Sequence, residues 1–412
     1  MSLPQILDIP GGYVFDWKEP EKINIKVNHL NNKNGELRGE ILITTSAPGY
    51  NPHLYLGTLN FMSGRTRKEL TKQLSELYET DWTSILEQLV VYTVDRFRRG
   101  EPVEDILVDN SLTTPPEYLI HPLVVKNYPN VLFGDPGSFK STFTLALIAG
   151  TVLPWTDNPL SWNVPEKPAG TMYLDWETDR DTVSWQLSRF QDGMRTGIIP
   201  IKYRRCSLPL YQDIERIMTA IVDYHIELVI IDSLGLACGG DLNEAATAIQ
   251  FFSALRQLKV TSLILAHTSK DKLSKNKTIF GSVYFEAQAR NIWHLKKRQE
   301  SGEDSLDLLI KNTKPPPFSK KQQDLAYHVD FSDDTIKISK ERPAEVGEFL
   351  QELSTSTRII EYLKDNPKST PKDIATNLGL TDGNVRISLK RLREKNLVVK
   401  LDGDNYGLLA KT

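Results

Sequence analysis

Cysteine is scarce in this chain, which has only Cys206 and Cys238 among its 412 residues. Two cysteines are too few for a disulfide framework or a zinc site built on thiolates. Long apolar runs are also missing, because none approaches the roughly 18 residues that a membrane span requires. The first residues lack the basic start and apolar stretch of a signal peptide. We therefore expect a protein of the reducing cytoplasm, with no membrane partner.

The chain has no strong excess of either charge, because 50 lysines and arginines are set against 53 aspartates and glutamates. The resulting net charge of −3 does not exclude nucleic acid as a partner. Binding depends on where the basic residues lie rather than on their sum. The length of 412 residues predicts more than one domain, at about 100–200 residues each.

Three regions differ in pattern. We predict a small N-terminal α+β domain over residues 1–112, an α/β domain over 113–343 and a winged helix-turn-helix domain over 344–412, with a polar, proline-containing linker near 109–116. The N-terminal region combines alternating strand runs at 23–27 and 40–45 with two helical patterns, at 67–79 and 82–99. Without a catalytic constellation, it is interpreted as a packing, oligomerisation or adaptor domain.

In the central region, apolar strands alternate with amphipathic segments. The expected strands are 131–133, 171–174, 228–231, 261–266, 291–295 and 306–310, and the expected helices are 141–148, 181–190, 210–224 and 243–258. This alternation predicts a largely parallel sheet covered by helices on both faces. Functional side chains should gather at the carboxyl ends of the strands.

A phosphate-binding loop is predicted directly after the first of these strands. Backbone N–H groups would surround the phosphates of ATP, Lys140 would reach the β- and γ-phosphates, and Ser141 would offer a hydroxyl to Mg²⁺. Phe139 occupies the place where the motif has glycine, and its ring is expected to point into the helix packing. The loop reads Gly134, Asp135, Pro136, Gly137, Ser138, Phe139, Lys140, Ser141, Thr142.

Four more polar residues stand at strand boundaries behind this loop. Glu177 is expected to orient and deprotonate the attacking water, and Asp232 to support Mg²⁺. His267 is expected to sense the γ-phosphate, although a histidine there can also be simply hydrogen-bonded. Arg290 precedes a strand and is either an arginine that acts on a neighbouring subunit or part of a surface ion pair.

Residues 119–331 resemble the hexameric-helicase branch of the RecA superfamily, most closely the RepA-type helicases of plasmids, phages and other mobile elements. The resemblance implies a RecA-like P-loop core in which Lys140, Ser141, Glu177, Asp232 and His267 form the ATPase site. It implies that the arginine finger falls on Arg290 and a second nucleotide-contacting lysine on Lys311, with Lys314 as an alternative. A finger acting in trans implies a homo-oligomer with sites between subunits, expected to be a hexamer.

Two regions are candidates for binding DNA. The loop after His267 carries four lysines that are expected to follow a single strand in the channel of a ring, unless it is an ordinary solvated loop. These are Lys270, Lys272, Lys275 and Lys277. A glycine-containing loop at 237–242 is a second, less specific channel candidate.

The C-terminal region is basic, and its second long helix places Arg386, Lys390 and Arg393 on one face, opposite an apolar stripe. We expect this winged helix to bind duplex DNA, with a protein-interaction role as the alternative.

The sequence therefore predicts an ATP-dependent DNA helicase or translocase that works as a ring in DNA replication, with a primase or another replication protein as a candidate partner. The rival hypothesis is a DNA-bound switch or accessory protein that ATP controls without unwinding. A recombinase-like filament is a third hypothesis.

Overall fold

The computed structural model describes residues 2–9, 11–100, 103, 105, 116–269, 277–331, 334–341 and 353–409. The chain forms two compact units, Met1–Thr113 and Thr114–Thr412. The boundary expected at 343/344 and most of the expected linker lie outside the described residues. The division into three domains therefore stays a prediction.

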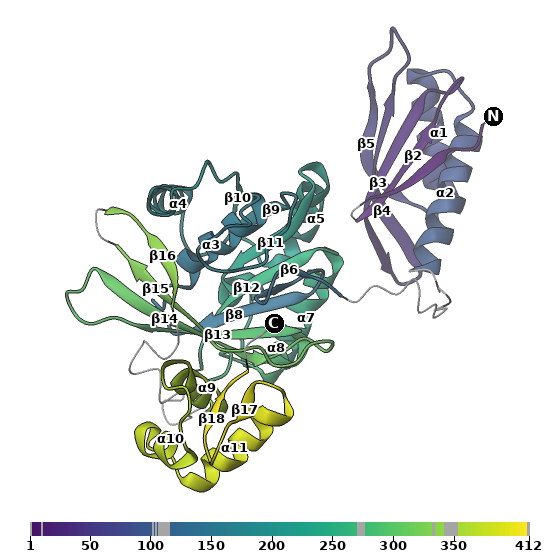
Figure 1. Ribbon diagram of the computed structural model, residues 1–412. Helices are drawn as coiled ribbons and strands as arrows, with labels where there is room; N and C mark the ends of the chain where they lie inside the picture. The colour runs from purple at the N-terminus through teal and green to yellow at the C-terminus, as the bar shows by residue number, and fades with distance from the viewer. Residues whose placement is uncertain are drawn as a thin grey trace. The chain divides into compact units, whose positions relative to one another are not determined.

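The N-terminal unit is an antiparallel sheet with two helices (Figure 1). Its strands follow one another in the order β1-β2-β3-β4-β5. The alternation in β3 and β4 directs every second side chain into a core shared with the helices, so the predicted α+β architecture is confirmed. The elements are β1 (Gln5–Ile9), β2 (Gly12–Trp17), β3 (Ile23–Lys33), β4 (Glu36–Thr45), β5 (His53–Asn60), α1 (Gly64–Leu77) and α2 (Trp82–Arg99).

The second unit is built on a nine-stranded sheet in the order β10-β9-β11-β12-β8-β13-β14-β15-β16. Its first six strands in this order are parallel, and β14 to β16 are antiparallel. The strands are β8 (Pro129–Gly134), β9 (Gly170–Asp175), β10 (Lys202–Arg205), β11 (Ile226–Asp232), β12 (Thr261–His267), β13 (Asn291–Arg298), β14 (Ser305–Lys314), β15 (Leu325–Asp330) and β16 (Lys337–Glu341). The predicted α/β fold with a largely parallel sheet is confirmed.

Helices cover both faces of this sheet (Figure 1). Ile230 of β11 points into the core formed with α3 and α4, whereas its neighbours Val229 and Ile231 point into the core formed with α5 to α8. Burial on both faces explains why these strands are continuous apolar runs. The helices are α3 (Lys140–Val152), α4 (Arg180–Met194), α5 (Leu210–Asp223), α6 (Leu234–Cys238), α7 (Ala245–Gln257) and α8 (Val283–Gln288), and a small hairpin, β6 (Tyr118–Ile120) with β7 (Val124–Val125), precedes β8.

The C-terminal elements form a winged helix, as predicted. Thr370 and Asp373 form a capping box at the start of the second helix, and Gly379 ends it with a left-handed backbone at φ 60°. The third helix buries Val385, Leu389 and Leu392 in this core. The elements are α9 (Thr355–Asp365), α10 (Pro371–Leu378), α11 (Asp382–Glu394), β17 (Val398–Lys400) and β18 (Tyr406–Leu408). Within the described ranges, no helix is both long enough and apolar enough to cross a membrane.

Candidate ATPase site

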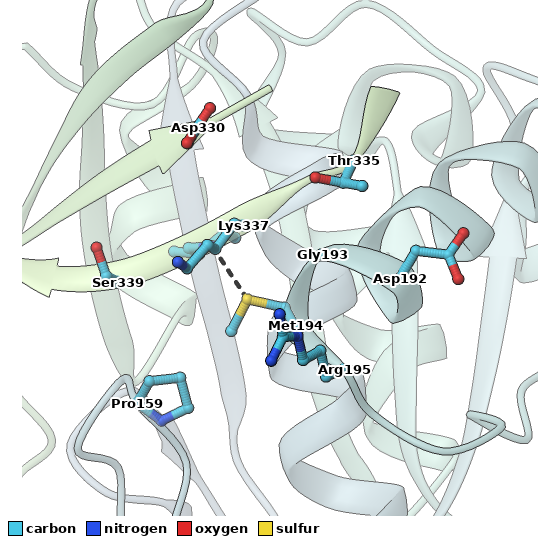
Figure 2. Close-up of a pocket in the computed structure, with 10 residues that line it drawn as sticks. Pro159, Asp192, Gly193, Met194, Arg195, Asp330, Thr335, Lys337 and Ser339 are labelled. Atoms are coloured by element: carbon cyan, nitrogen blue, oxygen red, sulfur yellow. Dashed lines mark hydrogen bonds between the residues drawn. The ribbon is translucent and has the colours of Figure 1, made fainter. Parts of the chain in front are cut away.

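A surface pocket of about 500 Å³ lies between the end of α4 and strand β16 (Figure 2). Its lining mixes Arg195 and Lys337 with Asp192 and Asp330, and it includes none of the residues predicted to bind nucleotide. The candidate site is instead located by the polar side chains at the carboxyl ends of β8, β9, β11 and β12.

Lys140 is the first residue of α3, directly after the phosphate loop that leads from β8, and its side chain turns back onto that loop. Its ammonium donates hydrogen bonds to the carbonyl oxygens of Gly134 at 3.1 Å and Asp135 at 2.9 Å, and to Ser138 Oγ at 3.3 Å. Only 7% of Lys140 is exposed. Burial lowers the pKa of the ammonium, while Asp232, Glu177 and Asp135 oppose that shift. The loop therefore holds a cation where phosphate oxygens are expected to bind.

Phe139 adopts the left-handed backbone that glycine provides in this motif, with φ at 75°. Its ring packs edge-on against Phe331, with 5.4 Å between ring centroids. The side chain thus packs at the border of the core, as predicted, and the backbone conformation is kept despite the missing glycine.

Phe139→Gly is expected to destabilise the protein less than Phe139→Ala, by about 1 kcal/mol. Both lose the contact with Phe331, but only glycine adopts φ near 75° without a steric penalty. Urea unfolding of the two variants measures this difference. Phe331→Ala is the matched control, because it removes the ring contact and leaves the loop backbone unchanged. Equal destabilisation by glycine and alanine would contradict a strained backbone at Phe139.

His267 lies between Lys140 and Glu177. Its Nδ1 is 3.5 Å from Lys140 Nζ, and its Nε2 is 3.5 Å from Glu177 Oε1. Ser233 Oγ donates a hydrogen bond to the same Glu177 oxygen at 2.7 Å. Hydrogen bonding by His267, assisted by Ser233, lowers the pKa of Glu177. Glu177 is therefore an ionised, oriented carboxylate about one third exposed, in a position to accept a proton.

Asp232 ends β11 as a buried carboxylate. Tyr173 donates a hydrogen bond to it at 2.5 Å, and Ser141 is a second hydrogen-bonding partner. Burial raises the pKa of Asp232, and these hydrogen bonds oppose that rise. A cation beside the carboxylate would favour its charged form.

The oxygen atoms of Ser141 and Asp232 fit Mg²⁺, which prefers oxygen ligands. Among the described residues there is no group of three or more His, Cys, Asp or Glu side chains placed to bind a metal ion by themselves. Protein sites for Mg²⁺ usually combine one or two carboxylates with substrate phosphates and water, so the two residues suit a metal that arrives with a nucleotide.

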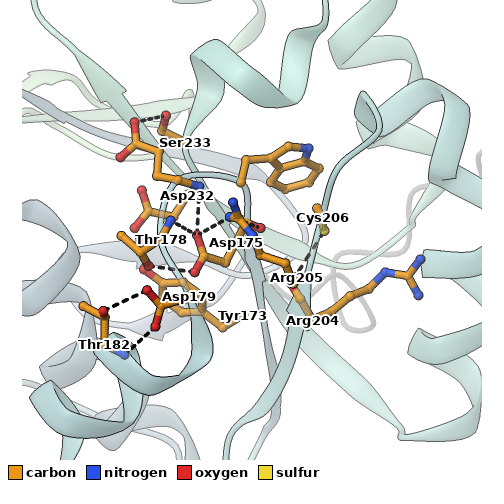
Figure 3. A network of polar contacts seen from close by, with 12 residues as sticks. Tyr173, Asp175, Thr178, Asp179, Thr182, Arg204, Arg205, Cys206, Asp232 and Ser233 are labelled. Carbon is orange, nitrogen blue, oxygen red and sulfur yellow. Dashed lines mark hydrogen bonds and ion pairs between the residues drawn. The ribbon is translucent and has the colours of Figure 1, made fainter.

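Two supporting residues were missed from the sequence. Ser233 follows Asp232 directly, and its position after a buried strand was a usable signal. Asp175 lies two residues before Glu177 and had no predicted role. It is fully buried and receives hydrogen bonds from Glu177 and Thr178 (Figure 3).

The loop that carries the four lysines after His267, called the lysine loop below, is bonded to the phosphate loop at its base. Thr268 donates a short hydrogen bond to the Asp135 carboxylate, and its N–H bonds to the Gly134 carbonyl at 3.2 Å. Lys277 lies on the returning side of the loop, partly exposed. The other three predicted DNA-binding lysines, Lys270, Lys272 and Lys275, lie outside the described residues.

Arg290 lies at the amino ends of the parallel strands, whereas the phosphate loop lies at their carboxyl ends. Its N–H bonds to the carbonyl of Pro129, the first residue of β8, whereas the loop follows Gly134 at the other end. At about 3.3 Å per residue, the two ends of β8 are about 16 Å apart. The Arg290 side chain is exposed at the amino end of β8, so it is too far from the phosphate loop to complete the site of its own chain.

The two candidate lysines of β14 have different surroundings. Lys311 is opposite His294, which in turn is level with Phe133 near the loop end of β8. Lys314 donates to the carbonyl oxygens of Glu286, Ala287 and Ala289 at the end of α8. Burial, followed by the nearby Arg290, lowers the pKa of Lys314. Lys314 therefore caps a helix end, whereas Lys311 lies nearer the nucleotide end of the sheet.

The predicted DNA-contacting residues of α11 are all exposed. Arg386 also connects α11 to the wing, because it pairs with Asp382 at 2.7 Å and with Asp404 at 3.0 Å. Lys400 binds the same Asp404 carboxylate. Lys390 and Arg393 lie further along the helix, outside this cluster.

Two family profiles match parts of the chain. A family described as "AAA domain" matches residues 93–272, which include the phosphate loop, Glu177, Asp232 and His267. A family described as "Winged helix-turn-helix DNA-binding" matches residues 353–399. A comparison with curated protein sequences found no match.

Among solved structures, the chain is similar to a KaiC-like protein from the hyperthermophilic archaeon Pyrococcus horikoshii. The two are 16% identical, the TM-score is 0.36, and the match covers 53% of this chain and 93% of that protein. The fold and the two family profiles together support an ATPase domain similar to AAA domains, followed by a region similar to DNA-binding winged helix-turn-helix domains.

Proposed function

We propose that this protein is an ATP-dependent DNA helicase or translocase, which works as a ring-shaped oligomer, expected to be a hexamer, in DNA replication. The observation that carries the proposal is the continuous set of contacts from Lys140 through His267 to Glu177. It connects a phosphate-binding cation, a strand-end sensor and a water-activating carboxylate across three strands of one sheet.

In this proposal each residue has a defined chemical role. Lys140 and the loop N–H groups bind the phosphates, and Glu177 accepts a proton from the water that attacks the γ-phosphorus. His267 touches both side chains, so a change at the γ-phosphate would move it relative to Glu177. Ser141 and Asp232 would hold Mg²⁺, which supplies charge neutralisation on the phosphates.

The oligomer is supported by the place of Arg290. An arginine that stabilises transition-state charge must lie within contact distance of the phosphates. Arg290 lies beside the first residue of β8, at the opposite end of that strand from the phosphate loop of its own chain. It would therefore serve the loop of a second copy. Lys311 remains the proposed second nucleotide-contacting residue.

DNA is proposed to bind at two places. The lysine loop would contact a single strand in the ring, and its base is already bonded to Asp135 of the phosphate loop through Thr268. A shift of the phosphate loop on ATP hydrolysis would therefore be transmitted through Thr268 to the lysine loop. The winged helix would contact duplex DNA through Lys390 and Arg393, with Arg386 shared between DNA and the wing.

The alternative is an ATP-regulated DNA-binding switch or replication accessory protein that unwinds nothing. Phe139 favours it, because the loop keeps its backbone by strain and by packing on Phe331 rather than through glycine. Such a loop can bind ATP and turn it over slowly.

An unwinding assay on a forked duplex separates the two functions. We expect ATPase activity that single-stranded DNA stimulates, and unwinding that both Lys140→Ala and Arg290→Ala abolish. Arg256→Ala is the matched control, because Arg256 is an exposed arginine of α7 that hydrogen-bonds Gln288 and not the site. ATP turnover without unwinding or translocation would support the switch and overturn the motor.

Mixing the two inactive variants tests the shared site. Lys140→Ala subunits still carry Arg290, and Arg290→Ala subunits still carry an intact loop. If Arg290 acts on the neighbouring chain, a mixture forms some complete sites and recovers ATPase activity. A mixture that stays inactive, although the two variants assemble together, would contradict action in trans.

A further inference from the structure

Asp175 is a carboxylate with no exposed surface, at the end of β9 (Figure 3). A buried charge is costly unless its oxygens are paired and hydrogen-bonded. Oδ1 accepts the N–H groups of Glu177 at 2.9 Å and Thr178 at 2.8 Å. Oδ2 accepts the hydroxyls of Thr178 at 2.8 Å and Tyr203 at 2.9 Å. Each oxygen of the carboxylate therefore accepts two hydrogen bonds.

The two backbone donors fix the peptide units on either side of Glu177. At its other end, the Glu177 carboxylate receives Ser233 Oγ at 2.7 Å. The intervening residue is also anchored, because Trp176 N–H bonds to the Asp232 carbonyl at 2.7 Å. Glu177 is therefore held both at its backbone and at its side chain, and Asp175 supplies the backbone half of that restraint.

Two residues of the edge strand β10 also contact Asp175. The Arg205 guanidinium is 3.5 Å from Asp175 Oδ1 and donates to the Asp175 carbonyl at 3.2 Å. Tyr203 donates its hydroxyl proton, and its pKa is raised by burial and by Asp175, so it remains a donor. A short strand far along the chain thereby orients the carboxylate.

We propose that Asp175, supported by Tyr203 and Arg205, is a positioning residue that holds the Glu177 backbone in the place required for water activation. The inference depends on the proposed function, in which Glu177 is the base. Asp175 itself touches no nucleotide in this scheme and acts through Glu177.

The test is ATP turnover by the full chain, with affinity for a fluorescent ADP analogue as a separate measurement. Asp175→Ala is expected to lower kcat about 100-fold, the cost of a misplaced catalytic group. Tyr203→Phe removes one hydrogen bond and should lower kcat about fivefold. Both should leave ADP affinity unchanged, because the phosphate loop is intact. Asp175→Asn keeps an acceptor for the two N–H groups and should recover much of the activity lost in Asp175→Ala.

A double variant distinguishes positioning from general stability. In a Glu177→Gln background, Asp175→Asn and Tyr203→Phe should cost no further turnover, because they act only through the removed base. The matched control is Asp179→Ala, which loses a carboxylate that caps α4 through Thr182 in the same loop. Asp179→Ala should retain wild-type kcat.

The possible outcomes separate the two levels of inference. If Asp175→Ala does not fold, Tyr203→Phe and the double variant decide the question. Wild-type kcat in Asp175→Ala or Tyr203→Phe, or equal further losses in the Glu177→Gln background, would overturn the positioning role. If Glu177→Gln alone leaves turnover intact, the proposed function fails first, whatever the Asp175 variants show.

Discussion

Replacing Glu177 with glutamine is expected to lower ATP turnover by about 100- to 10,000-fold, the contribution of a general base. Glutamine keeps the size of the side chain and can still accept the Ser233 hydroxyl, but it has no carboxylate to take a proton from water. The pKa of Glu177 is lowered by its hydrogen bond with His267, so the wild-type residue is ionised and ready at neutral pH. Affinity for ATP should remain near wild type, since Lys140 and the loop are unchanged.

Single-turnover hydrolysis with an equilibrium measurement of ATP binding tests this expectation. Glu166→Gln is a suitable control, because Glu166 is an exposed glutamate in the connection between α3 and β9. A Glu177→Gln protein that binds ATP and hydrolyses it at the wild-type rate would exclude Glu177 as the base. A loss of binding equal to the loss of rate would instead assign Glu177 to nucleotide affinity.

The residues that chemistry requires at strand ends were predictable because of how parallel sheets are built. A strand that is buried on both faces must be apolar along its length, so the first polar residue marks its carboxyl end. Asp232 and His267 each end such an apolar run, and both lie at the carboxyl ends of neighbouring parallel strands. The spacing in the sequence does not contain the strand order, so the contact of His267 with both Lys140 and Glu177 could not be derived from it.

Strand β10, by contrast, could not be predicted from an apolar run. Its four residues, Lys202 to Arg205, are mostly polar because an edge strand has one open side, and they gave no apolar signal. The two β10 partners of Asp175, Tyr203 and Arg205, were therefore not predicted, although Asp175 itself lies close to Glu177 in the sequence. The antiparallel strands β15 and β16 were missed for a similar reason, because short, partly exposed strands resemble loops in sequence.

Phe139 marks a further limit. Pattern alone identifies the residue that departs from the motif, but the backbone angle and the contact with Phe331 depend on a segment almost 200 residues away. The sequence predicts that the Phe139 side chain turns into the packing. Only the structure shows that the loop keeps the left-handed conformation there.

Lys140→Met is expected to abolish ATP binding and turnover without lowering the stability of the nucleotide-free protein. Three hydrogen bonds and the contact with His267 Nδ1 are lost, but so is a buried ammonium whose pKa is lowered, mainly by burial. A folded-state pKa below the unfolded one means that folding disfavours the charged form. This penalty is fully present below the folded-state pKa and fades as the pH rises through that value towards the unfolded pKa. Methionine keeps the aliphatic packing and removes the penalty.

Urea unfolding with and without Mg²⁺ and ATP separates the two effects. Without nucleotide, Lys140→Met should unfold at the same or a higher urea concentration than wild type. With ATP at 100 times its Kd, wild type should gain about 2.7 kcal/mol, and the variant should gain nothing. Lys167→Met, which changes an exposed lysine far from the loop in sequence, should behave as wild type in both conditions. An equal gain from ATP in Lys140→Met would mean that the phosphates bind elsewhere, and the loop would lose its assigned role.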